Sequence, residues 1–310
     1  ELGLAPTHEE PLTNLMVKFI SSYKDLPVYV YQFQNKFRNE LRAKSGILRT
    51  REFLMKDLYS FCADEETHNK FYDEVDRAYM RIYQRLGLGD CTYKTYASGG
   101  AFAKYSHEFQ TLTPIGEDTI YLNQDKTIAI NEEVMNDEVL ADLGAKREDF
   151  TPTTAAEVGN IFTLRYKFSE PIGLKFDDQD GVKKTVFMGS YGIGVSRVMG
   201  VIAEKFADEK GLVWPENIAP FKYYVIGIGD QGESLALDLH NSFRKQILLD
   251  DRKLRPGEKF ADAELMGIPY RVVISNKTLE NQTVEITNRK TGEVRTISVD
   301  EFKKELSSLN

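Results

Sequence analysis

A cluster of basic residues near the start of the chain lies between two apolar segments, 28–37 and 48–61, and extends into the first residues of the second. Both segments have the composition of strands. Its members are Arg38, Arg42, Lys44, Arg49 and Arg51. A guanidinium group stays charged and binds phosphate oxygens through two parallel hydrogen bonds. An arginine-rich loop held between buried strands could therefore bind a phosphorylated ligand.

A nearby aromatic residue and nearby carboxylates bear on this hypothesis. Phe53 lies four residues after Arg49, on the segment that returns from the loop, where its ring could stack on a nucleobase. In the simpler interpretation, Arg38 and Arg49 are solvated or pair with Glu40 and Glu52. Taken alone, a basic hairpin of this kind favours the simpler interpretation.

Two other short patterns are ambiguous in the same way. Gly192-x-Gly194 precedes a helix that contains Arg197, and a Gly-x-Gly at a helix start is usually only a tight turn. Thr7 and Glu9 stand at the start of another helix, where a hydroxyl and a carboxylate commonly cap the first turn. The residues alone favour capping for Thr7 and Glu9, and a surface salt bridge for Arg197.

The spacing of apolar residues predicts the elements that must position these groups. Up to residue 190 it predicts two helices, over 9–24, where Pro27 ends the helix, and over 63–87. It predicts strands over 28–37, 48–61, 92–97, 118–122, 161–168 and 184–189, and an acidic helical connector over 131–149. A strand end, a glycine turn and a helix follow within 189–208. After the proline-containing segment 211–221 come strands over 222–228, 247–250 and 270–275, helices over 232–247, 257–267 and from 299, and a polar hairpin over 282–297. This alternation is typical of a small α/β unit with a mixed sheet.

The composition is typical of a globular protein in a reducing compartment. Of the 310 residues, 41% are hydrophobic, and no apolar run approaches the roughly 18 residues that span a bilayer. Cys62 and Cys91 do not make a disulfide framework, and no His/Cys cluster has the spacing of a zinc site. We therefore expect a cytoplasmic protein without a membrane partner. The net charge of -8 argues against an indiscriminate nucleic-acid binder but allows a specific one with local basic patches.

Together, the motifs resemble those of class II aminoacyl-tRNA synthetases. Segments 37–40 and 49–53 resemble motif 2 of these enzymes, and segment 192–197 resembles motif 3. The stretch LAPTHEE (4–10) resembles the TxE loop of the bacterial-type prolyl-tRNA synthetases. Further stretches similar to signatures of that family are REFLMKDLYSF (51–61), SHEFQ (106–110), GEDTI (116–120) and LLDDRKLRPGEKFADAELMGIP (248–269). The resemblance runs from about residue 4 to the C-terminus.

The resemblance implies a fold and a domain organisation. It implies an α+β class II synthetase catalytic domain, an antiparallel sheet flanked by helices, over 1–212. A linker over 213–221 and a small α/β anticodon-binding domain with a mixed sheet over 222–310 follow. Because the chain opens at the TxE-like loop, we expect the motif 1 segment, which builds the homodimer interface in this family, to lie outside these residues.

The resemblance also implies an activity, the formation of prolyl-adenylate from proline and ATP with Mg²⁺, followed by transfer of proline to tRNA(Pro). It implies that Arg38 and Arg197 are catalytic and hold the phosphates, that Glu40 meets the adenine edge and that Phe53 stacks on the adenine. The implied ATP-binding residues are Arg38, Glu40, Arg49, Phe53, Glu157, Asn160, Gly194 and Arg197. Mg²⁺ would arrive with ATP and face Glu157, since no cluster of protein ligands is evident.

The family also implies sites for proline and for the anticodon. The implied proline-binding residues are Thr7, Glu9, Arg38, Asp57, Tyr59, His107, Phe162 and Ser190. Thr7 and Glu9 would hold the imino nitrogen, whereas His107 and its neighbour Glu108 could equally be structural or face the substrate. The implied anticodon-binding residues are Asp251, Arg252, Arg255, Lys259, Asp262 and Glu264, because arginine and carboxylate groups can read guanine edges in single-stranded loops. Mixed charge of this kind is otherwise usually a solvated surface.

Several positions depart from the family pattern. About 35 residues, 124–158, stand where bacterial members commonly carry a large editing domain, and this is too few for such a domain. We therefore expect a separate editing factor, because a proline pocket cannot strongly reject a smaller amino acid by binding alone. Ser190 stands where cysteine is common, Asn160 where histidine is common, and Arg165 where glycine is common. Arg165 could point outward or alter substrate handling.

Two alternative functions stay open. A synthetase-like protein could bind tRNA or another partner without catalysis, and a threonine or serine ligase would share the class II motifs. The intact motif residues argue against the first alternative, because lost catalysis would release the phosphate-binding arginines first. The absence of an evident zinc constellation argues against the threonine enzyme.

Overall fold

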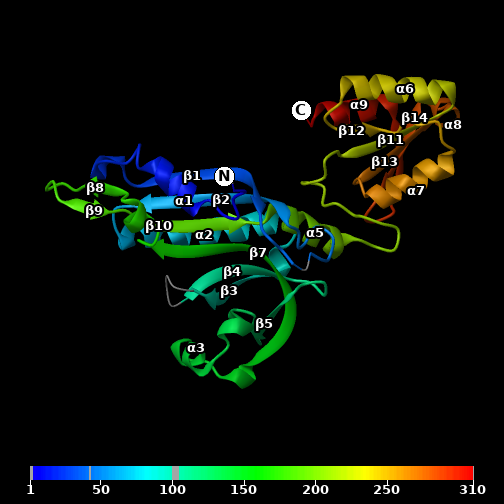
Figure 1. Ribbon diagram of the computed structural model, residues 1–310. Coiled ribbons are helices and arrows are strands. Elements are labelled where there is room, and N and C mark those ends of the chain that lie inside the picture. Colours follow the sequence, from blue (N-terminus) through cyan, green and yellow to red (C-terminus); the bar gives the residue numbers. More distant parts are fainter. Residues whose placement is uncertain (1–2, 42, 100–104, 310) are drawn as a thin grey trace. The chain divides into compact units, whose positions relative to one another are not determined.

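The computed structural model describes residues 3–41, 43–99 and 105–309, so that Arg42 of the basic loop lies outside the described residues. The chain divides into two compact units, Glu1–Val201 and Ile202–Asn310. Each unit is built around its own large sheet (Figure 1).

The first unit contains an eight-stranded sheet with the order β1-β2-β10-β7-β4-β3-β6-β5. Its strands are β1 (Val28–Phe37), β2 (Glu52–Cys62), β3 (Thr92–Ser98), β4 (Tyr105–Leu112), β5 (Asp118–Asn123), β6 (Ala129–Asn131), β7 (Phe150–Arg165) and β10 (Phe187–Ile193). Paired strands run antiparallel, apart from β3 and β6. β8 (Lys175–Asp177) and β9 (Lys183–Thr185) form a separate hairpin. The sheet thus has the antiparallel character expected of a class II core.

The pleat of the central strands decides which side chains share a face. Directly opposite residues of antiparallel neighbours point to the same side of a sheet. Ser190 of β10 lies opposite both Tyr59 of β2 and Phe162 of β7. The next residue, Tyr191, lies opposite Ile161 and points to the other side. Each side therefore receives alternate residues of these strands.

Helix α2 (Glu65–Arg85) covers one face of this sheet (Figure 1). It begins after Asp64, whose carboxylate accepts a hydrogen bond from the backbone amide of Thr67, in keeping with the acidic opening of this segment. Tyr83 is fully buried, and a Cβ on Gly159 of β7 would lie 2.4 Å from its hydroxyl. Glycine at this position therefore lets the helix approach the sheet closely.

Helix α1 (Glu9–Met16) is shorter than the helix predicted over 9–24. The backbone amides of Ser21 and Ser22 both donate to the carboxylate of Asp25 at 2.9 Å. These local bonds give the backbone an alternative to a continued helix. The prediction of one continuous helix is therefore wrong.

The segment between β5 and β7 packs around a small core of its own. The buried side chains of Ile130, Val139 and Leu140 meet there with Phe150. Asn123, the last residue of β5, pairs with Phe150, the first residue of β7, so the chain leaves and re-enters the sheet at neighbouring positions. Helix α3 (Asp137–Asp142) lies in this segment, whereas α4 (Ser169–Ile172) and α5 (Val195–Phe206) follow β7. Short 3-10 turns occur at Tyr23–Asp25, Gly89–Cys91, Glu132–Val134 and Arg147–Asp149.

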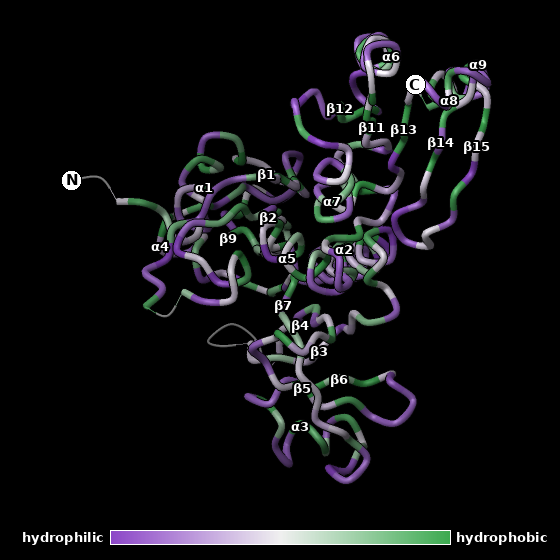
Figure 2. Tube along the Cα trace, turned by 90° about the vertical axis from the view of Figure 1, so that its right-hand side faces the viewer, coloured by the Kyte–Doolittle hydropathy of each residue, from purple (hydrophilic) through white to green (hydrophobic). Residues whose placement is uncertain are grey.

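The second unit has a five-stranded sheet with the order β12-β11-β13-β14-β15. β11 runs parallel to β12 and β13, whereas β13, β14 and β15 are antiparallel, so that the predicted mixed sheet is confirmed. The strands are β11 (Tyr223–Ile228), β12 (Ile247–Leu249), β13 (Tyr270–Ser275), β14 (Thr283–Asn288) and β15 (Val294–Ser298). Figure 2 shows apolar residues along β11 and a hydrophilic turn between β14 and β15.

Helices cover both faces of this second sheet. They are α6 (Gly229–Ser242), α7 (Pro256–Met266), α8 (Asn276–Leu279) and α9 (Val299–Ser307). Leu239 of α6 and Phe302 of α9 pack with Val272 in one buried cluster. Ala263 of α7 packs with Tyr224 in a cluster on the other face. In the described parts of the chain, no helix combines the length and apolar character needed to cross a membrane.

The residues that follow α5 belong to the second unit and bond within it. Arg289 forms two hydrogen bonds with the carboxylate of Asp208, at 2.6 and 2.7 Å. The indole of Trp214 donates to the carbonyl of Met266 at 3.1 Å. These bonds do not test the predicted domain boundaries, so the division into 1–212, a linker over 213–221 and 222–310 stays a prediction.

Candidate functional site

A cleft of about 270 Å³ in the first unit brings together four separate segments of the chain. They are the loop between β1 and β2 with the start of β2, the turn between β4 and β5, the middle of β7, and the turn between β10 and α5. All eight residues predicted to bind ATP line this cleft: Arg38, Glu40, Arg49, Phe53, Glu157, Asn160, Gly194 and Arg197. Glu117 and Asp118, which the sequence analysis did not assign, also line it.

Arg38 follows the last residue of β1 and closes the basic loop. Its backbone amide donates to the carbonyl of Arg51 at 2.8 Å. Its guanidinium carbon lies 5.1 Å from the centre of the Phe53 ring, and its Nε donates to the carbonyl of Pro6 at 3.2 Å. Arg38 therefore connects the cleft to the segment that carries Thr7.

Arg49 is held between two carboxylates. Its Nε donates to Glu40 and a terminal nitrogen donates to Glu117, both at 2.6 Å. Lys44 forms a further ion pair with Glu117 at 3.3 Å. The hydrogen bonds to Glu117 and Glu40 raise the pKa of Arg49 above its usual value, so that the side chain keeps its charge. The simpler interpretation of the sequence thus anticipated the Arg49–Glu40 pair, although this pair lines a cleft.

Arg197 of α5 ties the basic loop to β7. Its Nε donates to the carbonyl of Leu48 at 3.0 Å, and a terminal nitrogen donates to the carbonyl of Glu157 at 2.9 Å. The same nitrogen lies 3.3 Å from the Glu157 carboxylate, whose other oxygen accepts from Asn160 at 2.8 Å. A Cβ on Gly200 would lie 2.9 Å from Leu48, so this glycine lets the loop approach α5. Arg197 is therefore part of the cleft wall rather than of a solvated helix surface.

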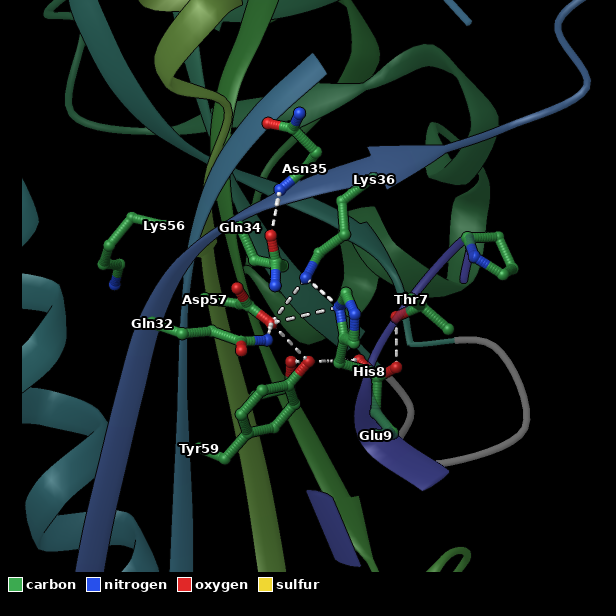
Figure 3. Close-up of polar contacts among 12 residues, drawn as sticks. Thr7, His8, Glu9, Gln32, Gln34, Asn35, Lys36, Lys56, Asp57 and Tyr59 are labelled. Carbon is green, nitrogen blue, oxygen red and sulfur yellow. Dashed lines mark hydrogen bonds and ion pairs between the residues drawn. The ribbon is translucent and has the colours of Figure 1, made fainter. Parts of the chain in front are cut away.

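A second group of predicted residues gathers around Glu9 at the start of α1 (Figure 3). The hydroxyl of Thr7 donates to one carboxylate oxygen of Glu9. The hydroxyls of Ser190 and Tyr59 lie 3.4 and 3.5 Å from the other oxygen. The residue at the N-cap of α1 is His8, whose side chain makes no capping bond. Glu9 therefore contacts the sheet, and Thr7 bonds to Glu9, instead of the two serving only as helix caps.

Lys36 and Asp57 form a buried ion pair of 2.8 Å beside this group (Figure 3), and they are only 1% and 2% exposed. The same Asp57 oxygen accepts from Gln32 at 3.0 Å and from Tyr59 at 2.9 Å. Lys36 also donates to Nδ1 of His8. Among the described residues, the other Asp57 oxygen, Oδ1, is buried and has no hydrogen bond. That oxygen is able to accept a hydrogen bond from a ligand.

Sequence reasoning assigned Asp57 but missed Lys36, Gln32 and His8. One signal was present, because Gln32, Gln34 and Lys36 alternate along β1 and therefore share one face of the strand. Their partner on β2 could not be identified without the register, which places Gln32 opposite Asp57.

The structure does not bring His107 to this site. His107 lies opposite Ile161 of β7, one residue before Phe162, and therefore points to the face covered by α2. There its Nδ1 shares a hydrogen bond of 2.8 Å with the hydroxyl of Tyr72, and burial lowers the pKa of His107 to about 3. This placement corrects the assignment of His107 to the proline-binding set. The adjacent residue Glu108 points to the opposite face, the same face as Phe162.

Glu108 lies in an acidic hollow that it shares with Glu157 and Asp118. The side-chain amides of Gln110 and Asn131 donate to one Glu108 oxygen at 2.9 and 3.0 Å. Burial, followed by the charges of Glu157 and Asp118, raises the pKa of Glu108 to about 7. Glu108 is thus a partly buried carboxyl group that exchanges its proton near neutral pH.

Glu108→Gln is expected to stabilise the chain at pH 8 by about 1–2 kcal/mol. Between the ordinary pKa of 4.5 and the raised value of about 7, the folded chain holds a proton that the unfolded chain has lost. The stability of the wild type therefore falls as pH rises through this window, and the amide removes that loss. Urea unfolding at pH 5 and pH 8 measures the effect, with the exposed Glu132→Gln as control. An equal gain at both pH values would contradict this account.

Four of the six predicted anticodon-binding residues lie at the surface of the second unit. Asp251 and Arg255 are exposed. Arg252 and Asp262 form an ion pair of 2.8 Å in which 46% and 37% of the side chains remain exposed. Arg252 also bonds to Asp250, which lowers the pKa of Asp250 to about 2. These residues present mixed charge on one loop and the adjoining helix.

The other two residues of that set have partners within the unit. Lys259 is 4% exposed, and its ammonium donates to the carbonyl of Asp250 at 3.0 Å. Glu264 pairs with Lys210 at 3.5 Å and with Arg271 at 3.7 Å. The ammonium of Lys259, which was expected to contact the anticodon, is thus buried and bonded to the backbone at the start of the exposed loop 251–255.

Arg165 ends β7 and points away from the cleft. Its φ angle is 53°, in the left-handed region that favours glycine, which accounts for glycine being common at this position. Its side chain is 53% exposed and lies 3.5 Å from Glu65 at the start of α2. Of the two interpretations of the sequence, the outward one is therefore correct.

Arg165→Gly is expected to be more stable than Arg165→Ala by about 1 kcal/mol. Both variants lose the exposed ion pair, but only alanine keeps the Cβ that strains this backbone conformation. Comparing the urea midpoints of the two variants separates the backbone effect from the side-chain effect. Equal midpoints would show that the left-handed conformation carries no strain.

Family models match both units. The model described as the tRNA synthetase class II core domain (G, H, P, S and T) matches residues 1–206, and the model described as the anticodon binding domain matches residues 222–309. A solved structure of prolyl-tRNA synthetase from Cryptosporidium parvum, complexed with halofuginone and AMPPNP, is similar with a TM-score of 0.75. At 21% identity, this likeness establishes the fold; it covers 98% of this chain and 57% of that chain.

Curated relatives specify the family further. The chain is 38% identical to the proline–tRNA ligase of Anaplasma phagocytophilum (strain HZ), over 99% of this chain and 76% of the relative. It is 37% identical to the proline–tRNA ligase of Ehrlichia chaffeensis (strain ATCC CRL-10679 / Arkansas), over 97% of this chain and 74% of the relative. This chain therefore belongs to the proline–tRNA ligases, a family of class II aminoacyl-tRNA synthetases.

Proposed function

We propose that this chain performs the family reaction itself, activating proline with ATP in the cleft and transferring it to tRNA(Pro). The observation that carries the proposal is the cleft itself. It gathers all eight residues implied by the resemblance from three segments that are distant in the sequence. The family membership and the class II core support the same reaction.

In this proposal, the nucleotide lies between the basic loop and α5. Phe53 stacks on the adenine and Glu40 meets its polar edge. Arg49 binds the outer phosphates, which requires it to exchange its carboxylate partner Glu117 for phosphate oxygens. Arg197 binds the γ-phosphate from the α5 side.

Proline is proposed to lie next to Arg38, between the cleft and Glu9. The carboxylate of Glu9, with the hydroxyl of Thr7, accepts the secondary ammonium of proline. The unpaired Oδ1 of Asp57 supports a further acceptor at the same place. Phe162 forms an apolar wall for the ring.

The first reaction step needs positioning and charge more than a covalent nucleophile. A proline carboxylate oxygen bonds to the α-phosphorus as the bond to the pyrophosphate oxygen breaks. Arg38 holds the carboxylate and the α-phosphate together and balances the negative charge of the transition state. Transfer then moves the prolyl group to a terminal ribose hydroxyl of the tRNA, with AMP as the leaving group.

Magnesium fits this cleft only in company with the nucleotide. In the described ranges, no group of three or more His, Cys, Asp or Glu side chains is arranged to hold a metal ion. Mg²⁺ commonly binds through one or two carboxylates plus substrate phosphates. Glu157 would be such a carboxylate, and the ion would add positive charge at the phosphates.

The remaining parts of the proposal concern partners. The exposed loop with Asp251, Arg252 and Arg255 is proposed to contact the anticodon. We further propose a homodimer, a cytoplasmic location, and a separate factor that hydrolyses mischarged tRNA.

Proline-dependent ATP–pyrophosphate exchange by this chain tests the proposal, with alanine, threonine and serine in parallel. Exchange that depends on proline is the expected result. Exchange with threonine or serine instead would assign another ligase activity. No exchange with any amino acid, together with retained tRNA binding, would favour a binding protein without catalysis.

A further inference from the structure

Three consecutive residues at the end of β1 hold the segment before α1. Lys36 donates from its ammonium group to Nδ1 of His8. The backbone amide of the next residue, Phe37, donates to the carbonyl of Ala5 at 3.1 Å. Arg38, the third, donates to the carbonyl of Pro6. These three bonds attach the segment that carries Thr7 and Glu9 to the end of β1, and of their three acceptors only His8 is titratable. The Glu9 carboxylate makes separate contacts with Tyr59 and Ser190.

The bond between Lys36 and His8 requires a neutral imidazole. An ammonium group has donors only, so Nδ1 of His8 must offer its lone pair. A proton on Nδ1 removes that acceptor and places two positive charges side by side. The Lys36–Asp57 pair does not depend on His8 and keeps Lys36 in place.

The charged and titratable groups around His8 come from three elements. Lys36 lies on β1, Asp57 and Tyr59 on β2, and Glu9 on α1. Burial, followed by the charge of Lys36, lowers the pKa of His8, whereas Asp57 and Glu9 oppose the shift. His8 is therefore neutral in the attached segment at pH 7 and above.

We propose that His8 is a positioning residue that attaches the Thr7–Glu9 segment to β1, and that its protonation releases this segment and weakens proline binding. The part of this proposal that concerns proline rests on the proposed function. In the released segment, His8 regains its ordinary pKa of 6.5. Attachment is therefore complete above pH 6.5 and weakens as pH falls below that value.

The KM for proline as a function of pH tests the proposal in wild type, His8→Asn and His8→Ala. Asparagine keeps an acceptor near the position of Nδ1 but does not titrate. From pH 7.5 to pH 5.5, we expect the wild-type KM to rise about 3- to 10-fold, the size of one hydrogen bond. The KM of His8→Asn should stay level, and that of His8→Ala should be high at both pH values. The KM for ATP, measured in the same assays, serves as the internal control.

Two outcomes would overturn the proposal. One is a KM for proline that changes with pH in parallel in wild type and His8→Asn. The other is a KM in His8→Ala at pH 7.5 equal to that of the wild type. Neither outcome can be attributed to misfolding, because both require active variants.

Hydrogen exchange of the peptide 3–16, without proline or ATP, tests the attachment independently of activity. At pH 5.5 the wild type should exchange faster than His8→Asn, and at pH 7.5 the two should match. Comparing variants at one pH removes the intrinsic pH dependence of exchange. Equal hydrogen exchange in wild type and His8→Asn at pH 5.5 as well as at pH 7.5 would refute the attachment. A chain that shows no proline-dependent ATP–pyrophosphate exchange would refute the proposed function, but the hydrogen-exchange comparison would still test the attachment.

Discussion

Replacing Arg38 with alanine is expected to lower kcat/KM in proline-dependent ATP–pyrophosphate exchange by about 100- to 1,000-fold. Arg38 lines the cleft and also bonds to the segment beside Glu9, so in the proposed arrangement one side chain contacts both substrates. Its loss removes the charge that balances the transferring phosphoryl group. Arg38→Lys should recover little of the rate, because an ammonium cannot form the two parallel bonds of a guanidinium.

Arg51→Ala provides the matched control for Arg38→Ala. Arg51 belongs to the same basic loop, and its Nε donates to the carbonyl of Glu40 at 2.9 Å, but it does not line the cleft. A loss of less than about 3-fold is expected, the size of one exposed hydrogen bond. Equal losses in the two variants would mean that loop structure, rather than contact with the substrates, explains the effect of Arg38.

Lys36→Met is expected to lower the free energy of unfolding by about 3–5 kcal/mol, because it leaves the buried carboxylate of Asp57 without its counter-ion. Urea unfolding at pH 7.5 measures the loss. The double variant Lys36→Met/Asp57→Asn should regain most of it, since no buried charge remains. A double variant as unstable as the single one would show that packing of the lysine, and not its charge, is responsible.

The same double variant separates folding from binding. Its stability should return, but its KM for proline should remain raised, because the proposed Asp57 carboxylate has become a neutral amide and Lys36 no longer donates to His8. A double variant with a normal KM for proline would remove Asp57 from the proposed site. This comparison needs both measurements on the same preparation.

The sequence predicted β1 and α2 more closely than it predicted β4 and β7. β1 coincides with its predicted range, 28–37, and α2 differs from 63–87 by two residues at each end. The strand β4 was not predicted, because its buried residues include Ser106, Gln110 and Thr111, which lack apolar alternation. Strand β7 is longer than the predicted 161–168, because its first half pairs with β5 through residues that are not strongly apolar.

Site residues could be predicted where they belong to a local sequence motif. They could not be predicted where their role depends on a contact with a residue distant in the sequence. Six of the eight cleft residues belong to the short motifs 37–40, 49–53 and 192–197, and Glu157 and Asn160 were assigned from the family resemblance. Lys36 and His8 acquire their meaning only from contacts with each other and with Asp57, 28 and 21 positions away from Lys36. The assignment of His107 to the proline-binding set was wrong because adjacent residues of a strand face opposite sides of the sheet. The sequence did not show which side carries the site.

The pairing of Asn123 with Phe150 has a consequence for how this fold diversifies. Opposite residues of antiparallel strands lie about 5 Å apart, so the two ends of the intervening chain meet at one place. Loop-closure entropy grows only slowly with length, by about 0.6 kcal/mol for each doubling. The sheet can therefore accept either a short connector or an entire inserted domain at this junction. Neither would shift Glu157 and Asn160, because their register is fixed further along β7 by β4 and β10.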